Sequence, residues 1–409
     1  MNSAPRASLK TAAPAARRLL CLLALLPALL PALLPAAEPN SVWSVACKDV
    51  VGDWDDKTGT MGAVWHSAPR GQVFNNPVPG SWGARINPVN VTNNAVITIR
   101  RDVSPEKLGL KGGTINTIQI GDNFYSNATY FSGNGTLIIT SGGKLDTTPA
   151  LNALQYLNAA HISIPTWNRA RGGSRGHFIV EGNGIFNGGA TWIGRIQVPF
   201  SPKEIAALPV NKRSVSGELT LRDQATYLGG PFWLGVAPSV LDQFHSAGAN
   251  PDADITGTLN LIGSKLTVGI SDVGRDLNDD EKYAVYHFNS SGVINFVADK
   301  DGLSTLDLFS NAGPRQKLSI GSPDTARNRA FRINVDLSAL DFPAALAKGP
   351  AVYDLIKVRG FATPTTFETP GAVTFNVRGY DTARYAVKLV QLKEGRAHTL
   401  KLILSNKTN

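Results

Sequence analysis

The chain has 409 residues, of which 43% are hydrophobic and 17% are charged, and its formal net charge is +9. A chain of this length can bury a large core. The basic residues form no block interleaved with aromatic residues, so the sequence lacks the electrostatic pattern of a nucleic-acid-binding surface. We therefore expect no nucleic acid among the partners of this protein.

The first 37 residues have the pattern of a signal peptide. A leucine-rich run spans residues 19–34, and Pro35 to Ala37 offers small residues for cleavage. Four basic residues precede the run: Arg6, Lys10, Arg17 and Arg18. The alternative is a membrane anchor, but the run has 16 residues and contains Pro27 and Pro31, whereas a spanning helix needs about 20 residues. We predict a secreted, extracellular or cell-surface protein, with the periplasm as an alternative location, and no membrane span in the mature chain.

Cleavage would change the charge and the cysteine content. The leader carries four of the 40 basic residues and no acidic residue, so 36 basic residues would remain against 31 acidic ones, a net charge of +5. Cys47 would be the remaining cysteine. The mature chain could then form no intrachain disulfide, and its core would have to hold it together.

Residues 38–85 are rich in tryptophan, glycine and proline and show weak periodicity. Their tryptophans are Trp43, Trp54, Trp65 and Trp82. The first turn of a repeat protein needs a cover, because it would otherwise expose apolar surface and unpaired backbone. We interpret residues 38–85 as this N-terminal cap.

Residues 86–310 repeat a short phrase at a near-constant interval. The phrase has the form Gly-x-apolar-x-apolar and occurs at Gly135–Ile139, Gly176–Val180, Gly217–Leu221, Gly257–Leu261 and Gly292–Phe296. Its glycines are 41, 41, 40 and 35 residues apart. Alternation with period two indicates a strand with one buried face, and a fixed period of this length indicates a repeat architecture.

A second phrase, apolar-x-apolar-Gly, lies between copies of the first. It occurs at Ile118–Gly121, Thr191–Gly194, Phe232–Gly235 and Leu266–Gly269. Two phrases per period suggest two coils of about 20 residues each, stacked along one axis. The predicted fold is therefore all-β: a right-handed parallel β-helix, or solenoid, over residues 86–310.

Short helical insertions and a different C-terminal region complete the predicted architecture. Helix-start patterns occur at Thr148–Pro149 and at Ser201–Glu204, where a capping box has proline at the first helical position. Residues 238–244 are a third candidate. After residue 310 the period fades, and we interpret residues 311–409 as a C-terminal antiparallel β cap. Its strand-like runs are Phe331–Leu337, Val352–Val358, Val373–Val377, Tyr385–Leu392 and His398–Leu404.

The repeats resemble those of a family of large bacterial extracellular β-helix proteins. Gly135–Leu145 and Gly257–Gly269 are similar to the GTLxIxGGxLxVG repeat of autotransporter-passenger-like and PEP-CTERM-associated proteins. The resemblance implies a surface or secreted β-helix and carries no catalytic residues. Members often end in a Pro-Glu-Pro sorting tail; this sequence departs from the family in lacking that motif, which leaves the mode of attachment open.

Trp192 and Trp233 are the candidate binding residues. They are the middle residues of two second-phrase strands, 41 residues apart, so both should lie in one row on the outer surface. With two coils between them, their separation would be about 9.6 Å at a rung spacing of about 4.8 Å. Aromatic faces at this spacing suit contact with sugar rings. The alternative is that the insertions or the C-terminal cap cover both side chains.

Metal and acid–base signals are weak. Acidic residues cluster at 53–56, 252–254 and 272–280, but their spacing matches neither an EF-hand nor a calcium-binding nonapeptide. His161, His177, His245 and His287 are scattered and belong to no recognisable catalytic motif. We expect no metal and no cofactor, and we assign no catalytic residue.

These observations favour an exported, non-enzymatic solenoid protein of the cell surface or matrix, adhesive or glycan-contacting through Trp192 and Trp233. Its partners would be extracellular polysaccharide or other surface proteins. One alternative is a polysaccharide lyase or hydrolase on the same scaffold, which would need carboxylates that converge in a cleft. Another alternative is a purely structural spacer.

Overall fold

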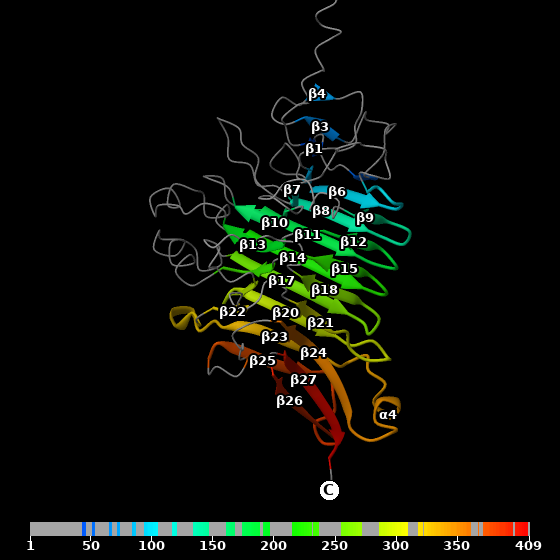
Figure 1. The fold of residues 1–409 in the computed structure, drawn as a ribbon, viewed down its shortest axis with the longest axis vertical. Coiled ribbons are helices and arrows are strands. Elements are labelled where there is room, and N and C mark those ends of the chain that lie inside the picture. The colour runs from blue at the N-terminus through cyan, green and yellow to red at the C-terminus, as the bar shows by residue number, and fades with distance from the viewer. Residues whose placement is uncertain are drawn as a thin grey trace, which may run out of the picture. The chain divides into compact units, whose positions relative to one another are not determined.

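Strands dominate the part of the chain that the computed structural model describes (Figure 1). The described residues are 43–45, 51–53, 65–67, 72–73, 84–86, 94–104, 117–120, 134–146, 161–167, 174–188, 191–196, 215–230, 232–236, 255–271, 286–309, 318–321, 323–360, 367, 371–395 and 397–407. They belong to one unit, Ser41–Asn409. The expected signal peptide and the three expected helical insertions lie outside them. In the described part, no helix combines the length and hydropathy that crossing a bilayer requires.

The described strands form three sheets. The nine-stranded sheet contains, in spatial order, β2 (Val51–Asp53), β6 (Asn94–Ile99), β8 (Asn134–Ile139), β11 (Ser174–Val180), β14 (Val215–Arg222), β17 (Ile255–Ile262), β20 (Gly292–Val297), β23 (Phe331–Asp336) and β25 (Val373–Arg378). The ten-stranded sheet contains β22 (Leu318–Ile320), β19 (Tyr286–Phe288), β16 (Phe232–Leu234), β13 (Thr191–Ile196), β10 (His161–Trp167), β7 (Thr117–Ile120), β5 (Ala84–Ile86), β1 (Trp43–Val45), β3 (Trp65–Ser67) and β4 (Gln72–Val73). The eight-stranded sheet contains β26 (Tyr385–Glu394), β27 (Ala397–Asn406), β24 (Ala351–Arg359), β21 (Leu306–Phe309), β18 (Thr267–Ser271), β15 (Thr226–Gly229), β12 (Ile185–Asn187) and β9 (Lys144–Asp146).

The chain visits the three sheets in a repeating order. From β8 to β24 it passes from the nine-stranded sheet to the eight-stranded sheet, then to the ten-stranded sheet, and back again. Successive visits to the same sheet pair in parallel, and Gly176 lies beside Gly217, 41 residues later. The period in the sequence therefore corresponds to one passage through all three sheets. The prediction of two coils per period is wrong, because the two phrases belong to different sheets and do not stack on each other.

The eight-stranded sheet is the one that the sequence analysis did not separate. Its repeating strands are short, with one buried side chain between two less buried ones in β9 and β12. The run Leu266–Gly269 overlaps β18 of this sheet, where Thr267 pairs with Thr226. The sequence analysis assigned this run to the same group as Phe232–Gly235, which lies in the ten-stranded sheet. Both sheets face the same core, so their strands have the same apolar alternation.

A single cluster of buried apolar side chains fills the space that the three sheets share. The alternating positions predicted to face inward are confirmed, since β17 alternates between buried and half-buried residues along its whole length. Leu259 and Leu261 are buried in this strand. Phe178, Phe186 and Tyr227 pack ring against ring, with the last two stacked at 5.5 Å between centroids. Burying each such side chain contributes about 1.5–3 kcal/mol, so the core holds the sheets together.

Two repeated glycines mark a close approach between sheets. Gly194 follows the inward residues of β13 and has a φ of 65°, a conformation that favours glycine. A Cβ atom on Gly194 would lie 2.3 Å from the carbonyl oxygen of Thr256, and a Cβ atom on Gly257 would lie 2.3 Å from that of Ile193. The end of a strand in one sheet therefore packs backbone against backbone on the start of a strand in another. Gly235 and Gly292 repeat this contact, which explains the glycine at these two positions of each phrase.

The parallel pairing continues beyond residue 310, the expected end of the repeat region. β23 pairs in parallel with β20, β25 with β23, and β24 with β21. Antiparallel pairing follows, with β27 between β24 and β26. The five strand-like runs expected between residues 331 and 404 all coincide with observed strands. At the other end of the described chain, β3 pairs antiparallel with β1 and β4.

Candidate functional site

Trp192 and Trp233 lie directly beside each other. They are paired in register between β13 and β16, their ring centroids are 4.9 Å apart, and their planes differ by 20°. The predicted shared row is confirmed. The predicted separation is wrong, because one passage through the three sheets lies between the two residues, where the sequence analysis assumed two.

The stacking decides which ring surfaces remain open. In a stack of nearly parallel rings, each ring covers one face of its neighbour. Trp192 is 8% exposed, and Trp233 is half-buried. A sugar ring packs on the open face of an aromatic ring, so the faces that Trp192 and Trp233 turn toward each other are not available to a sugar. In such a stack, the edges of the rings point away from the stacking axis.

His287 extends this stack by one strand. Its ring centroid lies 5.9 Å from that of Trp233, with 12° between the planes, and the two residues are paired in register between β16 and β19. The next residue in the row is Ser319, which has no ring. We name Trp192, Trp233 and His287 the ring stack. The sequence analysis missed His287 as a member because it follows Trp233 by 54 residues, although Tyr286–Phe288 has the same apolar-x-apolar form as Phe232–Leu234.

A row of hydrogen-bonded amides crosses the nine-stranded sheet. The amide nitrogen of Asn334 donates to the side-chain oxygen of Asn295 at 2.8 Å, and Asn295 donates to Asn260 at 2.7 Å. Asn260 in turn donates to Glu218 Oε1 at 2.5 Å and to Thr220 Oγ1 at 3.0 Å. We call Asn260, Asn295 and Asn334 the amide row. All its bonds run in one direction and end on a carboxylate, where charge strengthens the last hydrogen bond.

His177 lies at the end of the amide row, beside Glu218. Its Nε2 atom is 2.9 Å from Thr220 Oγ1 and 3.7 Å from Glu218 Oε1. Burial lowers the pKa of His177, Glu218 raises it and Arg222 lowers it, and the outcome is a pKa below the ordinary value. His177 is therefore neutral near pH 7. Among the other histidines named from the sequence, the side chain of His161 and the whole of His245 lie outside the described residues.

Arginine–carboxylate pairs recur between neighbouring strands. Arg222 pairs with Glu181, one passage earlier, and Arg359 pairs in the same way with Asp307. Arg378 Nη2 lies 2.8 Å from Asp336 Oδ2. Hydrogen bonds from Ser338 are the largest cause that lowers the pKa of Asp336, and Arg378 lowers it further. Of the three carboxylates, Asp336 is thus held in the ionised form by its neighbours Ser338 and Arg378.

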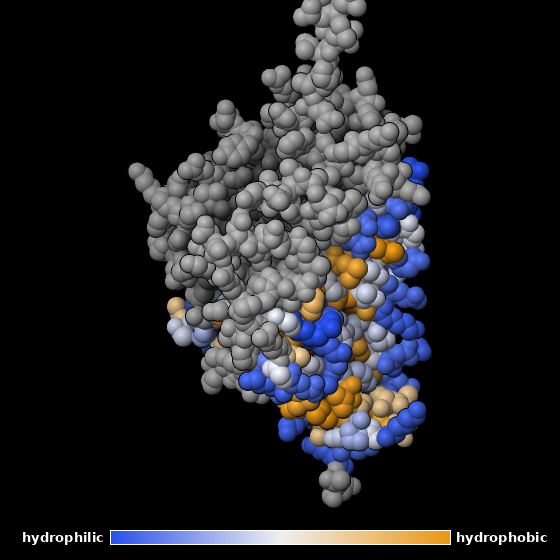
Figure 2. Space-filling model, viewed as in Figure 1, coloured by the Kyte–Doolittle hydropathy of each residue, from blue (hydrophilic) through white to orange (hydrophobic). Residues whose placement is uncertain are grey.

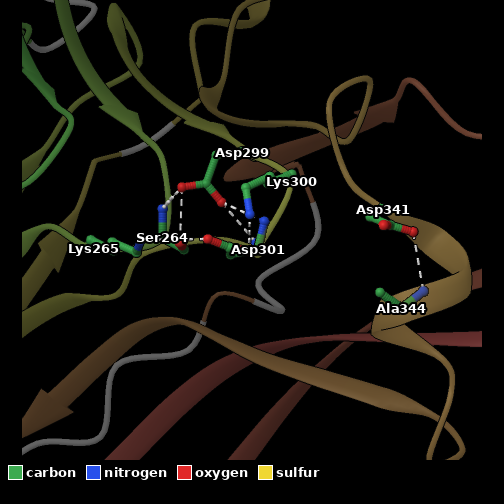
Figure 3. Close-up of polar contacts among 8 residues, drawn as sticks. Ser264, Lys265, Asp299, Lys300, Asp301, Asp341 and Ala344 are labelled. Carbon is green, nitrogen blue, oxygen red and sulfur yellow. Dashed lines mark hydrogen bonds and ion pairs between the residues drawn. The ribbon is translucent and has the colours of Figure 1, made fainter.

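Acidic residues in the described turns bind backbone amides (Figure 3). Asp299 Oδ2 accepts hydrogen bonds from the backbone nitrogen and the hydroxyl of Ser264, both at 2.8 Å, and Oδ1 accepts from the backbone of Asp301 and Gly302. Burial opposes ionisation of Asp299, but these hydrogen bonds outweigh burial and lower its pKa below the ordinary value. The backbone nitrogen of Asp341 donates to the carbonyl oxygen of Lys300 in this turn at 3.2 Å, and the side chain of Asp341 caps the start of α4 (Phe342–Ala345).

The acidic clusters named from the sequence show no metal site in the described residues. Asp53 forms an ion pair with Arg100 at 2.9 Å, while the clusters at 252–254 and 272–280 fall largely or wholly on residues that the structure leaves undescribed. Where the chain is described, no group of three or more histidine, cysteine, aspartate or glutamate residues could hold a metal ion.

A buried histidine near the C-terminus is a further feature that the sequence analysis missed. His398 is 4% exposed, and its Nδ1 atom lies 3.1 Å from Gln391 Nε2. Burial lowers the pKa of His398, and the charge of Lys393 lowers it further. The alternation of His398 with Leu400, Leu402 and Leu404 would have placed it on the inward face.

Comparison with known proteins identifies no relative: no family model matches the chain, and no curated protein or solved structure matches it significantly.

Proposed function

We propose that this chain is an exported, non-enzymatic protein of the cell surface or extracellular matrix, built as a right-handed parallel β-helix. Its function would be to present long, rigid side faces to extracellular polysaccharide or to other surface proteins. Export is inferred from the basic and leucine-rich leader at residues 1–37.

The repeating visits to three sheets support the β-helix. Each passage adds one strand to each sheet, and the core runs from one passage to the next. Stacked repeats of this kind derive their stability from neighbour contacts, so the length of the face scales with the number of repeats. The backbone contact between Gly194 and Gly257 brings two passages of the chain close together.

One observation carries the proposed function: outward side chains form continuous rows whose polar groups bind one another from strand to strand. The amide row is such a row, and the arginine–carboxylate pairs are separate links of the same kind between neighbouring passages of the chain. General acid catalysis on glycosides needs a carboxylic acid whose pKa is raised. The pKa values of Asp299, Asp336 and Asp354 are all shifted below the ordinary value, which favours a structural role for these carboxylates.

Within this proposal, Trp192 and Trp233 remain the glycan-contacting residues, and His287 joins them. Because the rings cover one another's faces, contact would use the ring edges. Trp233 and His287 are half-buried and Trp192 is buried. Trp233 and His287 would therefore contribute most of the contact, and Trp192 would support them.

A polysaccharide lyase or hydrolase is the second candidate, and one observation favours it. His177 is half-buried, has a lowered pKa and lies 3.7 Å from Glu218. A neutral histidine beside a carboxylate can accept a proton in a lyase reaction. The purely structural spacer is the third candidate, and the burial of Trp192 within the ring stack favours it.

The test is a binding screen of the full chain against a glycan array and insoluble polysaccharides, with release of reducing ends and of unsaturated products assayed on every hit. Trp233→Ala, His287→Ala and Trp192→Ala are compared with Leu228→Ala. Leu228 is a matched control because it is 41% exposed and lies in β15 of a different sheet. Each variant is checked for unchanged thermal unfolding, since Trp192 is buried.

We expect binding without product release, a loss of affinity of at least tenfold in Trp233→Ala and little change in Leu228→Ala. Equal binding by the wild type and all three ring-stack variants would reject the ring stack as the contact. Release of products that His177→Gln abolishes would replace the adhesive proposal with the enzymatic one. Binding to nothing on the panel would favour the spacer.

A further inference from the structure

The strand β26 forms one edge of the eight-stranded sheet. It pairs with β27 on one side and is the last strand in the order of the sheet. The backbone N–H and C=O groups on the other side of an edge strand are a template for pairing with another strand. β26 has 10 residues, so this edge is longer than that of β25, which has six.

The two faces of β26 differ in character. Tyr385, Val387 and Leu389 pack against the core. The alternate residues face the other way, and three of them, Lys388, Leu392 and Glu394, are exposed, with Leu392 at 41%. Figure 2 shows an apolar area in the region of β26 and β27 at the C-terminal end of the described chain. An exposed long strand with apolar side chains is an association site unless charge or cover protects it.

The outward side of β26 is self-complementary. In an antiparallel pair related by a two-fold axis through Gln391, residues with numbers that sum to 782 lie opposite each other, so Lys388 of each copy lies opposite Glu394 of the other. Val390 then lies opposite Leu392. Both kinds of pair occur twice, once on each side of the axis, and all four residues face the outer side of the sheet.

Other registers lack this match. An axis through Val390 would place Lys388 opposite Leu392, and an axis through Leu389 would place Lys388 opposite Val390. The lysines and the aspartate of the neighbouring strands already bind one another, since Asp354 pairs with Lys357 at 2.9 Å and Lys401 at 2.7 Å. In the described structure, Lys388 and Glu394 belong to no ion pair, so their charges are available to a second strand.

The edge strand β25 of the nine-stranded sheet does not offer an equivalent surface. In β25, an axis through Asn376 would place Arg378 opposite Thr374. Arg378 is already bound to Asp336 of β23. Self-pairing of β25 would therefore gain no complementary charge.

We propose that this chain forms a symmetric dimer by antiparallel pairing of β26 with β26 of a second copy, centred on Gln391. The pairing joins the two eight-stranded sheets into one continuous sheet across the two-fold axis. Two Lys388–Glu394 ion pairs and two Val390–Leu392 contacts set its register. This inference does not depend on the proposed glycan contact, because it uses a different part of the molecule.

Sedimentation equilibrium of the full chain over a range of concentrations tests the dimer. We expect the wild type to approach twice the single-chain mass, and we expect Lys388→Glu and Glu394→Lys each to weaken the dimer at least tenfold. The double variant restores the opposite charges with their positions exchanged, so it should recover dimerisation to within about threefold of the wild type. Lys393→Glu is the matched control, because Lys393 is exposed on the same strand but on the other face, and it should leave the dimer unchanged.

The far-ultraviolet circular dichroism and thermal unfolding of each variant show whether it is folded, and exposed surface positions should tolerate these changes. A wild type that stays monomeric at all concentrations would overturn the proposal. Dimerisation that is insensitive to both charge reversals, or that the double variant fails to restore, would also overturn it, because the dimer would then use another surface or register.

Discussion

Cross-strand pairing follows different rules in the parallel region and in the C-terminal antiparallel strands. In the parallel region, the residue beside Gly176 is Gly217, so each position lies next to its own equivalent one period later. In the antiparallel pair of β26 and β27, which are joined by a short turn that contains Gly395, Val390 lies opposite Lys401. Equivalent positions of successive repeats are therefore neighbours in the first region, as in the ring stack and the amide row, whereas positions that are not equivalent are neighbours in the second.

This difference determines how a single substitution spreads. A change in the parallel region interrupts a row that continues on both sides, so two neighbours lose a partner. Within one chain, a change on β26 affects one cross-strand partner, because β26 is the last described strand of its sheet. The following predictions test this contrast, beginning with the largest expected effect.

Phe186→Ala should destabilise the protein most. Phe186 is buried, stacks on Tyr227 and packs edge-on against Phe178. Removing a buried phenylalanine ring costs about 3–5 kcal/mol. Denaturant unfolding measures the change, and Leu389→Ala, a partly buried position on β26, is the comparison and should cost less. Equal losses at the two positions would show that the two regions have equally dense cores.

Asn295→Ala should break the amide row in two places. Asn295 donates to Asn260 and accepts from Asn334, so its loss leaves one acceptor and one donor without a side-chain partner. The expected cost is about 1–3 kcal/mol, as for half-buried groups left unsatisfied. The control is Asn376→Ala, the exposed position next in register after Asn334, with an expected change within about 0.5 kcal/mol. A similar small effect at both positions would argue that the row contributes little.

The pH dependence of stability should reveal His398 and His177. Burial lowers the pKa of His398 and of His177 below their ordinary value, so the folded protein binds fewer protons than the unfolded chain. The stability contributed by each is fully present above the unfolded pKa, about 6.5, and is lost as pH falls through the folded value. The free energy of unfolding should therefore fall between pH 7.5 and pH 5.

His398→Leu should make this decrease smaller, and His177→Gln should do the same, because the pKa of each histidine is lowered in the folded protein. Urea unfolding of the wild type and of each variant at pH 7.5 and pH 5 gives the four free energies of unfolding that each comparison needs. If the decrease in His398→Leu matched that of the wild type, His398 would not be responsible for it.

Arg222→Ala should have the smallest effect. Arg222 pairs with Glu181 across neighbouring strands, and the two side chains are 48% and 22% exposed. Exposed ion pairs contribute about 0–1 kcal/mol and are screened by salt. Unfolding in low and high salt should show a small loss that disappears in high salt. A loss above about 2 kcal/mol would mean that the arginine stem packs on the sheet as well as carrying a charge.

The sequence was sufficient to predict the strands of the nine-stranded sheet, because Gly257 to Leu261 and its equivalents recur with an inward apolar pair. It was not sufficient to count the sheets. A strand such as Lys144–Asp146 places one apolar residue inward, and a single inward residue has no detectable alternation. Two strands with the same alternation can be neighbours in one sheet or members of different sheets. This ambiguity caused the error in the predicted coil length.

For the ring stack, the constant 41-residue interval predicted that Trp192 and Trp233 share a row, and their pairing confirms it. His287 was missed because its distance from Trp233 departs from that interval. The amide row was missed because its members are 35 and 39 residues apart and because a single asparagine in a strand carries little information. The repeated phrase already aligns Asn260 with Asn295, as the fourth residue of two of its copies, and the register of β20 with β23 adds Asn334.

The register that places Gly176 beside Gly217 also has an evolutionary consequence. Copying residues 176–216 in frame would add one strand to each sheet and present every later residue with the neighbour type it already has. Unequal crossing-over between such copies would therefore lengthen or shorten the protein in whole units without creating a mismatched junction. An insertion of an odd number of residues inside a strand would shift the residues that follow it from the core to the solvent side. Length variation in this protein should accordingly be quantised, with intermediate sizes confined to the segments between strands.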